Sequence, residues 1–390
     1  MDPTLAQLWL LDPALTFLNH GSFGACPAVI LAAQTAWRER MERDPVRFME
    51  FDLEPALDAA RGRLAALVGA QHDDLAFVAN ATTGVNTALT SFGRELVAGD
   101  EILTTDHEYN AVLNAASRVA VERDARLVIA AVPFPVTGDD QVVEAILAAL
   151  TPRTRIAVIS HVTSATAVIF PIHRLVAELA ARNVLTIVDG AHAPGMVPVA
   201  IDALGAAAYA GNGHKWLCGP KGAGFLHVRR DLQERVRTLV TSHGANSPRR
   251  DRSRFRLEFD WVGTADPSAY LALADSVDYI PTLHPDGWSG VMAANHALVI
   301  AGRDIVAEAL GISAQPLAPD AMLGSMSAVL VPTDLTPVPA FAVSADPNDT
   351  MPLDPLHELL LEDHRIQVPV YPWPPVASRG RAAMRMLRLS

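Results

Sequence analysis

The sequence predicts an α/β protein, with a mostly parallel sheet in a large domain and a smaller α+β domain. Its 390 residues exceed the ~250–300 residues at which single hydrophobic cores stop growing. Short apolar runs alternate with helical periodicity between about residues 60 and 230, and this rhythm changes after about residue 265. Alternation at this spacing is typical of a parallel sheet with helices on both faces.

A series of apolar runs in the first part of the chain has the length of buried strands. They cover residues 75–80, 101–105, 126–132, 155–162, 184–189, 206–211 and 224–228. Helical periodicity is visible between them, over residues 84–97, 141–150 and 172–182. Because the carboxyl ends of parallel strands meet at one edge of a sheet, we expect the catalytic residues in the loops that follow these runs.

The change of rhythm divides the chain into three expected parts. We expect a large domain over residues 21–265 and a small domain over residues 266–390, with residues 1–20 as an arm that joins the small domain. The elements expected in the small domain are helices over residues 267–279 and 356–364 and a strand over residues 366–370. The region between the two helices contains Pro332, Pro337, Pro339, Pro347 and Pro352.

The composition argues against several kinds of partner. Half of the residues are hydrophobic and 19% are charged, which is typical of a folded enzyme. The net charge of −12 disfavours nucleic acid, because phosphate binding requires a basic surface. Polar residues, glycine and proline interrupt the uncharged stretch 13–37, so we expect neither a membrane span nor a secretory signal. With only two cysteines, Cys26 and Cys218, the chain is expected in the cytoplasm.

The basic residues are distributed unevenly between arginine and lysine. The 31 basic residues include only two lysines, Lys215 and Lys221. Arginine keeps its proton in proteins, whereas lysine can lose it, and only a neutral amine attacks a carbonyl to form an imine. Codon bias that left two lysines by chance is the alternative. The neighbours of Lys215 favour the functional interpretation.

Asp189 lies at the end of an expected strand. An acidic residue in this position is costly unless a cation faces it. A pyridinium nitrogen is such a cation, and a carboxylate beside it keeps the ring protonated, so that the ring can act as an electron sink. The alternative is a loop aspartate that caps the next helix.

Further candidate residues follow other strand ends. Lys215 comes after a segment of small residues, which let the backbone approach a ligand, and a phosphate could accept from Asn212 and His214 there. Thr82 and Thr83 lie where a strand gives way to a helix, and a helix N-terminus suits a phosphate. The alternatives are a surface histidine at His214 and an ordinary threonine N-cap.

His107 and Tyr109 follow the expected strand over residues 101–105. An aromatic ring in this position can stack on a cofactor ring. His107 can also serve as an acid or a base. A loop histidine without a role is the alternative.

The ordered set Thr82-Thr83, His107, Asp189 to His192 and His214-Lys215 resembles the class V aminotransferase group of fold-type I pyridoxal-phosphate enzymes. The segments 18–24, 45–48 and 260–267 resemble the isopenicillin N epimerase-like branch, which is related to the cysteine desulfurases. The resemblance extends from about residue 16 to the last residue. It implies a fold-type I PLP-dependent transferase fold, with pyridoxal 5'-phosphate (PLP) as the cofactor.

The resemblance implies a role for each matching residue. Lys215 would form the internal aldimine and Asp189 would pair with the ring nitrogen, while His107 would stack on the ring and His192 would contact its phenolic oxygen. The phosphate ligands that it implies are Thr82, Thr83, Asn212 and His214, and Thr264 from a neighbouring subunit of a homodimer with shared active sites. The substrate ligands that it implies are Arg388 as the carboxylate clamp, with Asn19 and His20. It implies no metal.

The implied function is a PLP enzyme that acts on an amino acid or a derivative of one, by epimerisation or C–S bond cleavage. No cysteine occurs between residues 366 and 388, where the cysteine desulfurases of this class carry their nucleophile, so persulfide chemistry is disfavoured. A class V aminotransferase and a persulfide-independent desulfurase-like lyase are the enzymatic alternatives. A PLP-binding regulator or a degenerate paralogue is the non-enzymatic one, although the pair of Asp189 and Lys215 argues against it. An NAD-dependent enzyme would carry Gly-x-Gly-x-x-Gly after the first strand, which residues 80–86 do not supply.

Overall fold

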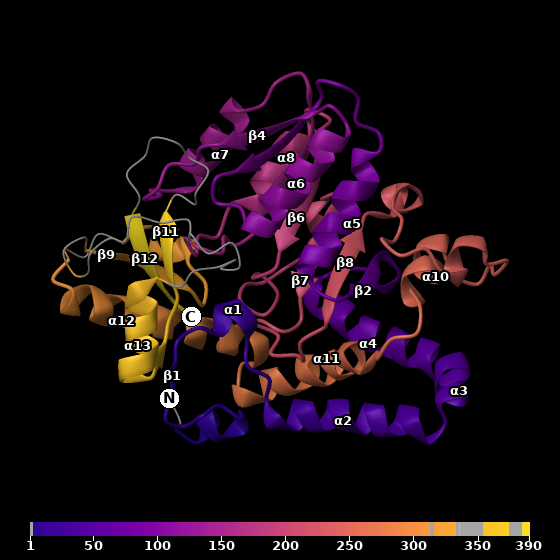
Figure 1. Ribbon diagram of the computed structural model, residues 1–390, viewed down its shortest axis with the longest axis horizontal. Helices are drawn as coiled ribbons and strands as arrows, with labels where there is room; N and C mark the ends of the chain where they lie inside the picture. Colours follow the sequence, from indigo (N-terminus) through magenta and orange to yellow (C-terminus); the bar gives the residue numbers. More distant parts are fainter. Residues whose placement is uncertain (1–2, 313–315, 333–334, 336–353, 374–383) are drawn as a thin grey trace.

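The computed structural model describes residues 3–312, 316–332, 335, 354–373 and 384–390. Its largest element is a seven-stranded sheet in the order β2-β8-β7-β6-β5-β3-β4 (Figure 1). The strands are β2 (Leu75–Val78), β3 (Glu101–Thr105), β4 (Arg126–Ala130), β5 (Thr154–Ser160), β6 (Leu185–Gly190), β7 (Ala208–Asn212) and β8 (Gly224–Val228). β8 is antiparallel to both of its neighbours, and the other pairs are parallel. The predicted α/β class with a mostly parallel sheet is confirmed.

The strands of this sheet are apolar on both faces, and helices cover each face. In β5, Ala157 and Ile159 belong to one core, whereas Ile156 and Val158 belong to the other. Successive strand residues point to opposite faces, so this sheet is buried on both sides. The first core includes α4 (Leu53–Val68), α7 (Asp139–Ala148), α8 (Ile172–Ala180), α9 (Ile201–Leu204) and α11 (Ser268–Tyr279). The second includes α5 (Ala81–Gly93), α6 (Asn110–Glu122) and α10 (Arg254–Asp260).

Local sequence signals explain where several of these helices begin and end. The side chain of Asn80 caps α5 by accepting from the main-chain N–H of Thr83, and Ser253 caps α10 in the same way. α4 ends at Gly69, whose φ of 64° is readily adopted only by glycine. The cap at Asn80 leaves the first turn of α5 at the carboxyl edge of the sheet, because β2 runs parallel to β7 two positions away.

A separate three-stranded antiparallel sheet, in the order β11-β12-β9, lies beside the large sheet (Figure 1). Its strands are β9 (Ser327–Val331), β11 (Val370–Trp373) and β12 (Met384–Leu389), and it packs with α12 (Gly287–Ala309) and α13 (Pro355–His364). β1 (Thr16–Phe17) pairs in parallel with β10 (Ile366–Gln367), which joins the first residues to this part. The expected prolines Pro337, Pro339, Pro347 and Pro352 lie outside the described residues.

Helix α11 connects the two parts of the chain. It follows the predicted boundary at residue 265, yet its Leu271 and Leu273 lie in the core of the large sheet, where α11 packs against α2 (Ala28–Arg43) and α4. The boundary therefore stays a prediction. The remaining short helices are α1 (His20–Phe23) and α3 (Pro45–Arg47). Within the described ranges, no helix combines the length and the apolar character that a membrane crossing requires.

Candidate active site

The carboxyl ends of the central strands surround a cavity of about 320 Å³. The loops that follow β2, β3, β5, β6 and β7 contribute to its wall, and so does α1. The residues that line the cavity include Ser22, Phe23, Thr82, Tyr109, Ser160, Ser164, Asp189, His192, Asn212, His214, Lys215 and Lys221. The volume lies within the range of small-molecule and cofactor sites, roughly 300–1,000 Å³.

Lys215 extends from the loop after β7 into this cavity. Its Nζ lies 2.8 Å from Nε2 of His192, and its main-chain oxygen lies 2.9 Å from Nε2 of His20. Burial, together with the positive charge of Arg388, lowers the pKa of Lys215 to about 7, while the charge of Asp189 opposes the shift. A large fraction of the amine is therefore neutral near neutral pH, as imine formation requires.

Asp189 lines the same cavity from the end of β6. The carboxylate is buried, and its Oδ1 accepts from the main-chain N–H of Ala191 at 2.9 Å. Burial raises the pKa of Asp189, while that N–H and the charge of Lys215 act to lower it. A cation bound in the cavity would compensate the cost of burying this charge.

The first turn of α5 forms a polar end of the cavity. Asn80 Oδ1 accepts from the main-chain N–H and the hydroxyl of Thr83, at 2.9 and 3.2 Å. Ala81 N–H donates to Oδ1 of Asn212 at 2.8 Å. Thr82 and Asn212 line the cavity, whereas Thr83 serves the cap and is not among the lining residues. The structure therefore brings Thr82 and Asn212, but not Thr83, to the predicted phosphate end.

His192 and His214 present ring nitrogens that a ligand can use. The Nδ1 atom of each is buried and has no hydrogen-bond partner within the described part of the chain. Burial and the charge of Lys215 lower the pKa of both rings, that of His214 to about 4, so both are neutral. Because buried polar atoms in native proteins are almost always partnered, these two atoms indicate that a polar ligand completes the site.

Arg388 approaches the cavity from the small sheet. It lies on the central strand β12 and is 1% exposed. Its Nη1 donates to the main-chain oxygen of Ser164 at 2.8 Å, and its Nη2 donates to Ser22 Oγ at 2.9 Å and to Asn19 Oδ1 at 3.3 Å. Its Cζ lies 5.2 Å from the ring centroid of Tyr371. Burial lowers the pKa of this arginine, and Tyr371 opposes the shift.

The guanidinium of Arg388 is a buried cation whose charge is not balanced by a described carboxylate. None of the described carboxylates forms an ion pair with it, and its Nε has no partner among the described side chains and main-chain atoms. A planar guanidinium binds a carboxylate with two parallel N–H donors. Arg388 is not among the residues that line the cavity, but it binds Ser22 and Ser164, which do, so its position suits the carboxylate of an amino acid bound there.

The turn after β3 places Tyr109, rather than His107, on the cavity wall. His107 is 2% exposed, and its ring centroid lies 4.2 Å from that of Trp373 and 5.6 Å from those of Phe134 and Phe170. Burial lowers the pKa of His107 to about 3. The structure does not bring the predicted stacking residue to the cavity, because an aromatic cluster holds its ring. Tyr109 supplies an aromatic ring there instead.

Thr264, His20 and Asn19 also lie outside the cavity wall, as Arg388 does. Thr264 is exposed and is not among the lining residues. His20 packs against Trp216, with 5.1 Å between ring centroids, and binds the main chain of Lys215. Asn19 contacts Arg388 without lining the cavity. His20 and Asn19 therefore contact the residues of the site, Lys215 and Arg388, without lining the cavity themselves.

Three residues that were not predicted from the sequence contact Arg388: Ser22, Ser164 and Tyr371. Ser22 belongs to the segment 18–24 that carries part of the resemblance, so its neighbours Asn19 and His20 were a usable signal. Ser164 and Tyr371 carry no local signal, since a loop serine and a strand tyrosine are common in any fold.

The second lysine holds the N-terminal segment against the loop of Lys215. Lys221 Nζ donates to the main-chain oxygen of Gly24 at 2.6 Å. Gly24 has a φ of +59°, and a Cβ there would lie 1.8 Å from the main-chain oxygen of His214. Only glycine allows this close approach. Both lysines of the chain therefore lie at the wall of the same cavity.

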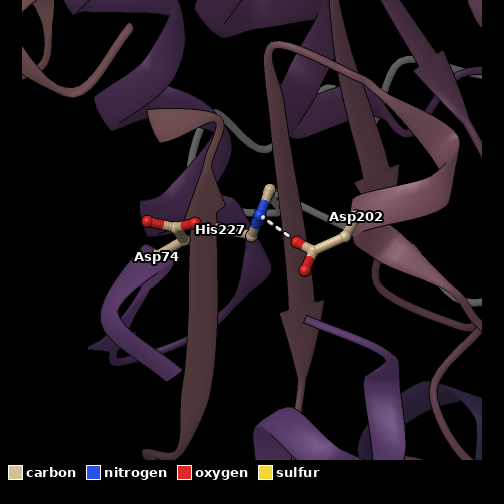
Figure 2. A group of neighbouring side chains, drawn as sticks. All are labelled: Asp74, Asp202 and His227. Atoms are coloured by element: carbon tan, nitrogen blue, oxygen red, sulfur yellow. Dashed lines mark hydrogen bonds and ion pairs between the residues drawn. The ribbon is translucent and has the colours of Figure 1, made fainter. Parts of the chain in front are cut away.

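A second group of titratable side chains, Asp74, Asp202 and His227, lies at the opposite edge of the large sheet (Figure 2). His227 Nε2 lies 3.2 Å from Asp202 Oδ1. Asp74 Oδ1 accepts from Gln233 Nε2 at 2.7 Å and pairs with Arg230 Nη2 at 2.8 Å. These contacts explain the group as a polar cluster that ties β2 and β8 to α9, and we assign no ligand to it.

The groups around the cavity fit PLP. Asp189 faces it as a carboxylate for a ring nitrogen, Lys215 offers an amine of low pKa for an aldehyde, and the N-terminus of α5 suits a phosphate. A parallel sheet buried on both faces, with these groups at its carboxyl edge, defines a PLP-dependent enzyme of fold type I. The chain belongs to the aminotransferase class-V family, whose sequence profile matches residues 19–286.

Known relatives agree with this assignment. The chain is 41% identical to an isopenicillin N epimerase of Amycolatopsis lactamdurans over 281 residues. This alignment covers 69% of this chain and 70% of that protein. It is 30% identical to an L-cysteine desulfhydrase of Arabidopsis thaliana over 310 residues. This alignment covers 75% of this chain and 66% of that protein.

A solved structure of a cystine C–S lyase with cysteine persulfide matches this fold with a TM-score of 0.75 and 21% identity, over 96% of this chain and 92% of that chain. The predicted fold type is confirmed by this likeness. The predicted resemblance to the isopenicillin N epimerase-like branch is confirmed by the relatives.

Proposed function

We propose that this enzyme removes the α-proton of an amino acid and then follows one of two courses. It returns a proton on the opposite face, as an epimerase, or it expels a sulfur group from the β-carbon, as a C–S lyase. The observation that carries this proposal is that Lys215 lines the cavity while Arg388 binds Ser22 and Ser164 of its wall. Two N–H donors of Arg388 would hold the α-carboxylate, which keeps the α-carbon within the cavity that Lys215 enters.

The cofactor, when bound, supplies a protonated ring that withdraws electrons from the α-carbon. Asp189 would hold the ring nitrogen in its protonated form. Lys215 would take the α-proton on its Nζ, and a pKa of about 7 suits proton exchange near neutral pH. His192 lies 2.8 Å from that Nζ and, as a neutral ring, would accept its N–H and orient the amine.

The relatives support these two reactions, since one is an isopenicillin N epimerase and another an L-cysteine desulfhydrase. A cysteine persulfide is not part of the proposal. Burial raises the thiol pKa of Cys26 to about 11 and that of Cys218 to about 12, and both side chains are buried. Because the thiolate is the nucleophile, neither cysteine is suited to attack sulfur.

The two reactions are separated by incubating the PLP-loaded enzyme with L- and D-amino acids and S-substituted cysteines in deuterated water. Epimerisation is expected to give α-deuterated product of inverted configuration. C–S cleavage is expected to give a sulfur compound with pyruvate and ammonia. Conversion of the cofactor to its amine form with release of a keto acid would favour the aminotransferase alternative. A protein that takes up no PLP would overturn the proposal as a whole.

We also propose a homodimer in which Thr264 of one copy contacts the phosphate bound by the other. Thr264 is exposed, and Phe23, which lines the cavity, is 70% exposed, so both are accessible to a second copy of the chain. Thr264→Ala is expected to weaken PLP binding roughly 10- to 100-fold, the usual worth of a hydrogen bond to a charged group. Thr137→Ala, at another exposed threonine, is the control.

PLP titration and light scattering measure the two parts of this proposal. A monomer, or unchanged affinity in Thr264→Ala, would contradict it. The free cysteines agree with a reducing compartment, and we propose the cytoplasm. Recovery of the native protein from the cytoplasmic fraction of its source cells tests the proposed cytoplasmic location.

A further inference from the structure

Glu108 is a buried carboxyl group that the proposed reaction does not use. It lies in the turn between β3 and α6 and is 4% exposed. Its Oε1 accepts from the hydroxyl of Ser160 at 2.6 Å and from the main-chain N–H of Tyr109 at 2.8 Å. Its Oε2 is buried and has no hydrogen-bond partner within the described residues. Both of its partners line the cavity.

The turn brings Glu108 close to Asp189. Ser160, which binds Glu108, is the register partner of Asp189 across β5 and β6. Burial, and after it the negative charge of Asp189, raises the pKa of Glu108 to about 8. Each buried carboxylate disfavours the charge of the other, so binding of one proton by the pair is favoured near neutral pH.

The surroundings decide which carboxyl group carries that proton. Asp189 lines the cavity, so a cationic ring nitrogen there would stabilise its charge. Glu108 does not line the cavity, and no described cation forms an ion pair with it. The charge is therefore favoured on Asp189 and the proton on Glu108.

We propose that Glu108 is a positioning residue that stores a proton beside Asp189, so that Asp189 remains ionised for the ring nitrogen of the cofactor. The inference rests on the proposed contact between Asp189 and that nitrogen. It also explains the contacts of Glu108 with Ser160 and with the main chain of Tyr109, which hold the neutral carboxyl group in one orientation.

Other titratable groups surround this pair on every element that packs there. They are Asp106, His107 and Tyr109 of the same turn, His161 after β5, His192 after β6, Tyr209 of β7, Lys215 after β7 and Arg388 of β12. The pKa of each histidine is lowered by burial, and those of Tyr109 and Tyr209 are raised. Besides Glu108 and Asp189, this set contains the carboxylic acid of Asp106, whose Oδ1 accepts from the main-chain N–H of Val132 at 2.9 Å, so the Glu108→Gln variant is needed to assign an acid band to Glu108.

Infrared difference spectroscopy on the PLP-loaded enzyme tests the inference. Near neutral pH we expect the carbonyl stretch of a protonated carboxylic acid in the wild type. It should be absent from Glu108→Gln and should decline in the wild type as the pH rises through about 8. PLP affinity in Glu108→Gln should stay within about threefold of wild type, because the amide is neutral and of similar shape.

Glu101→Gln is the matched control. Glu101 is equally buried on β3, but hydrogen bonds from Thr151 and from Arg126 outweigh the effect of burial and lower its pKa, so it is ionised. The acid band should therefore persist in Glu101→Gln. Ser160→Ala is a second variant in case Glu108→Gln fails to fold. Removing the hydroxyl that donates to Oε1 should shift the frequency of the band.

An acid band that survives in Glu108→Gln, or that is unchanged in Ser160→Ala, overturns the inference. A loss of PLP affinity beyond about 100-fold in folded Glu108→Gln overturns it as well, since the carboxylate charge would then be required. In both cases wild-type protein still binds PLP, and the proposed function stands. Wild-type protein that binds no PLP overturns the proposed function together with this inference.

Discussion

Lys215→Ala is expected to abolish covalent attachment of PLP and to lower kcat by at least about 10³-fold, because one side chain supplies both the nucleophile and the proton acceptor. Arginine cannot replace it, since the guanidinium does not lose its proton, so Lys215→Arg should be equally inactive. The visible absorption of the bound cofactor and the turnover of the best substrate measure the two effects. Retention of both in Lys215→Ala would contradict the assignment.

The second lysine of this chain makes the same experiment specific. The sequence contains only Lys215 and Lys221, and Lys221 Nζ is bound to the main-chain oxygen of Gly24. After borohydride reduction of the wild type, peptide mass mapping should locate the cofactor on Lys215 alone. Lys221→Ala should retain the visible band. Cofactor found on Lys221 would show that the wrong amine had been assigned.

Arg388→Ala is expected to lower kcat/KM for amino acids by roughly 30-fold to several thousand-fold. Truncating one partner of a buried, hydrogen-bonded charge pair costs about 2–5 kcal/mol, and about 1.4 kcal/mol corresponds to a factor of ten. The covalent attachment of PLP should be unchanged, because Lys215 and Asp189 are intact. Steady-state kinetics and the absorption spectrum separate the two effects.

A matched substrate and a conservative variant test the role of the guanidinium. An amine without a carboxylate should react equally slowly with wild type and Arg388→Ala, since it offers no anion to the clamp. Arg388→Lys keeps the charge but loses the planar pair of donors, so an intermediate value of kcat/KM is expected. If Arg388→Ala impairs the amine as strongly as the amino acid, Arg388 acts on the fold of the small sheet rather than on the substrate.

Much of the large sheet could be predicted because its signals are local. The run 101–105 matches β3 and the run 224–228 matches β8, since a buried strand is a short apolar segment with clear flanks. The pair of Asp189 and Lys215 was found for a similar reason. Asp189 lies at the end of one parallel strand and Lys215 follows the next, so topology alone predicts that both reach one edge of the sheet.

The small sheet gave weaker signals. β12 contains Arg385 and Arg388 and was not predicted as a strand, yet it is the central strand between β9 and β11. Two arginines can be buried in this central strand because each guanidinium binds partners from segments far away in the sequence. Arg385 pairs with Asp354, and Arg388 meets Ser22 and Ser164. No local pattern encodes such partners.

The sequence by itself determined the fold class, the family resemblance and the residues expected to hold PLP, because strand periodicity and short motifs are properties of neighbouring residues. The tertiary structure decided that Tyr109 rather than His107 lines the cavity, that Thr83 serves a helix cap, and that Glu108 lies beside Asp189. These outcomes depend on which side chains from distant strands compete for the same space and the same hydrogen bonds. That competition is settled only when the chain is packed.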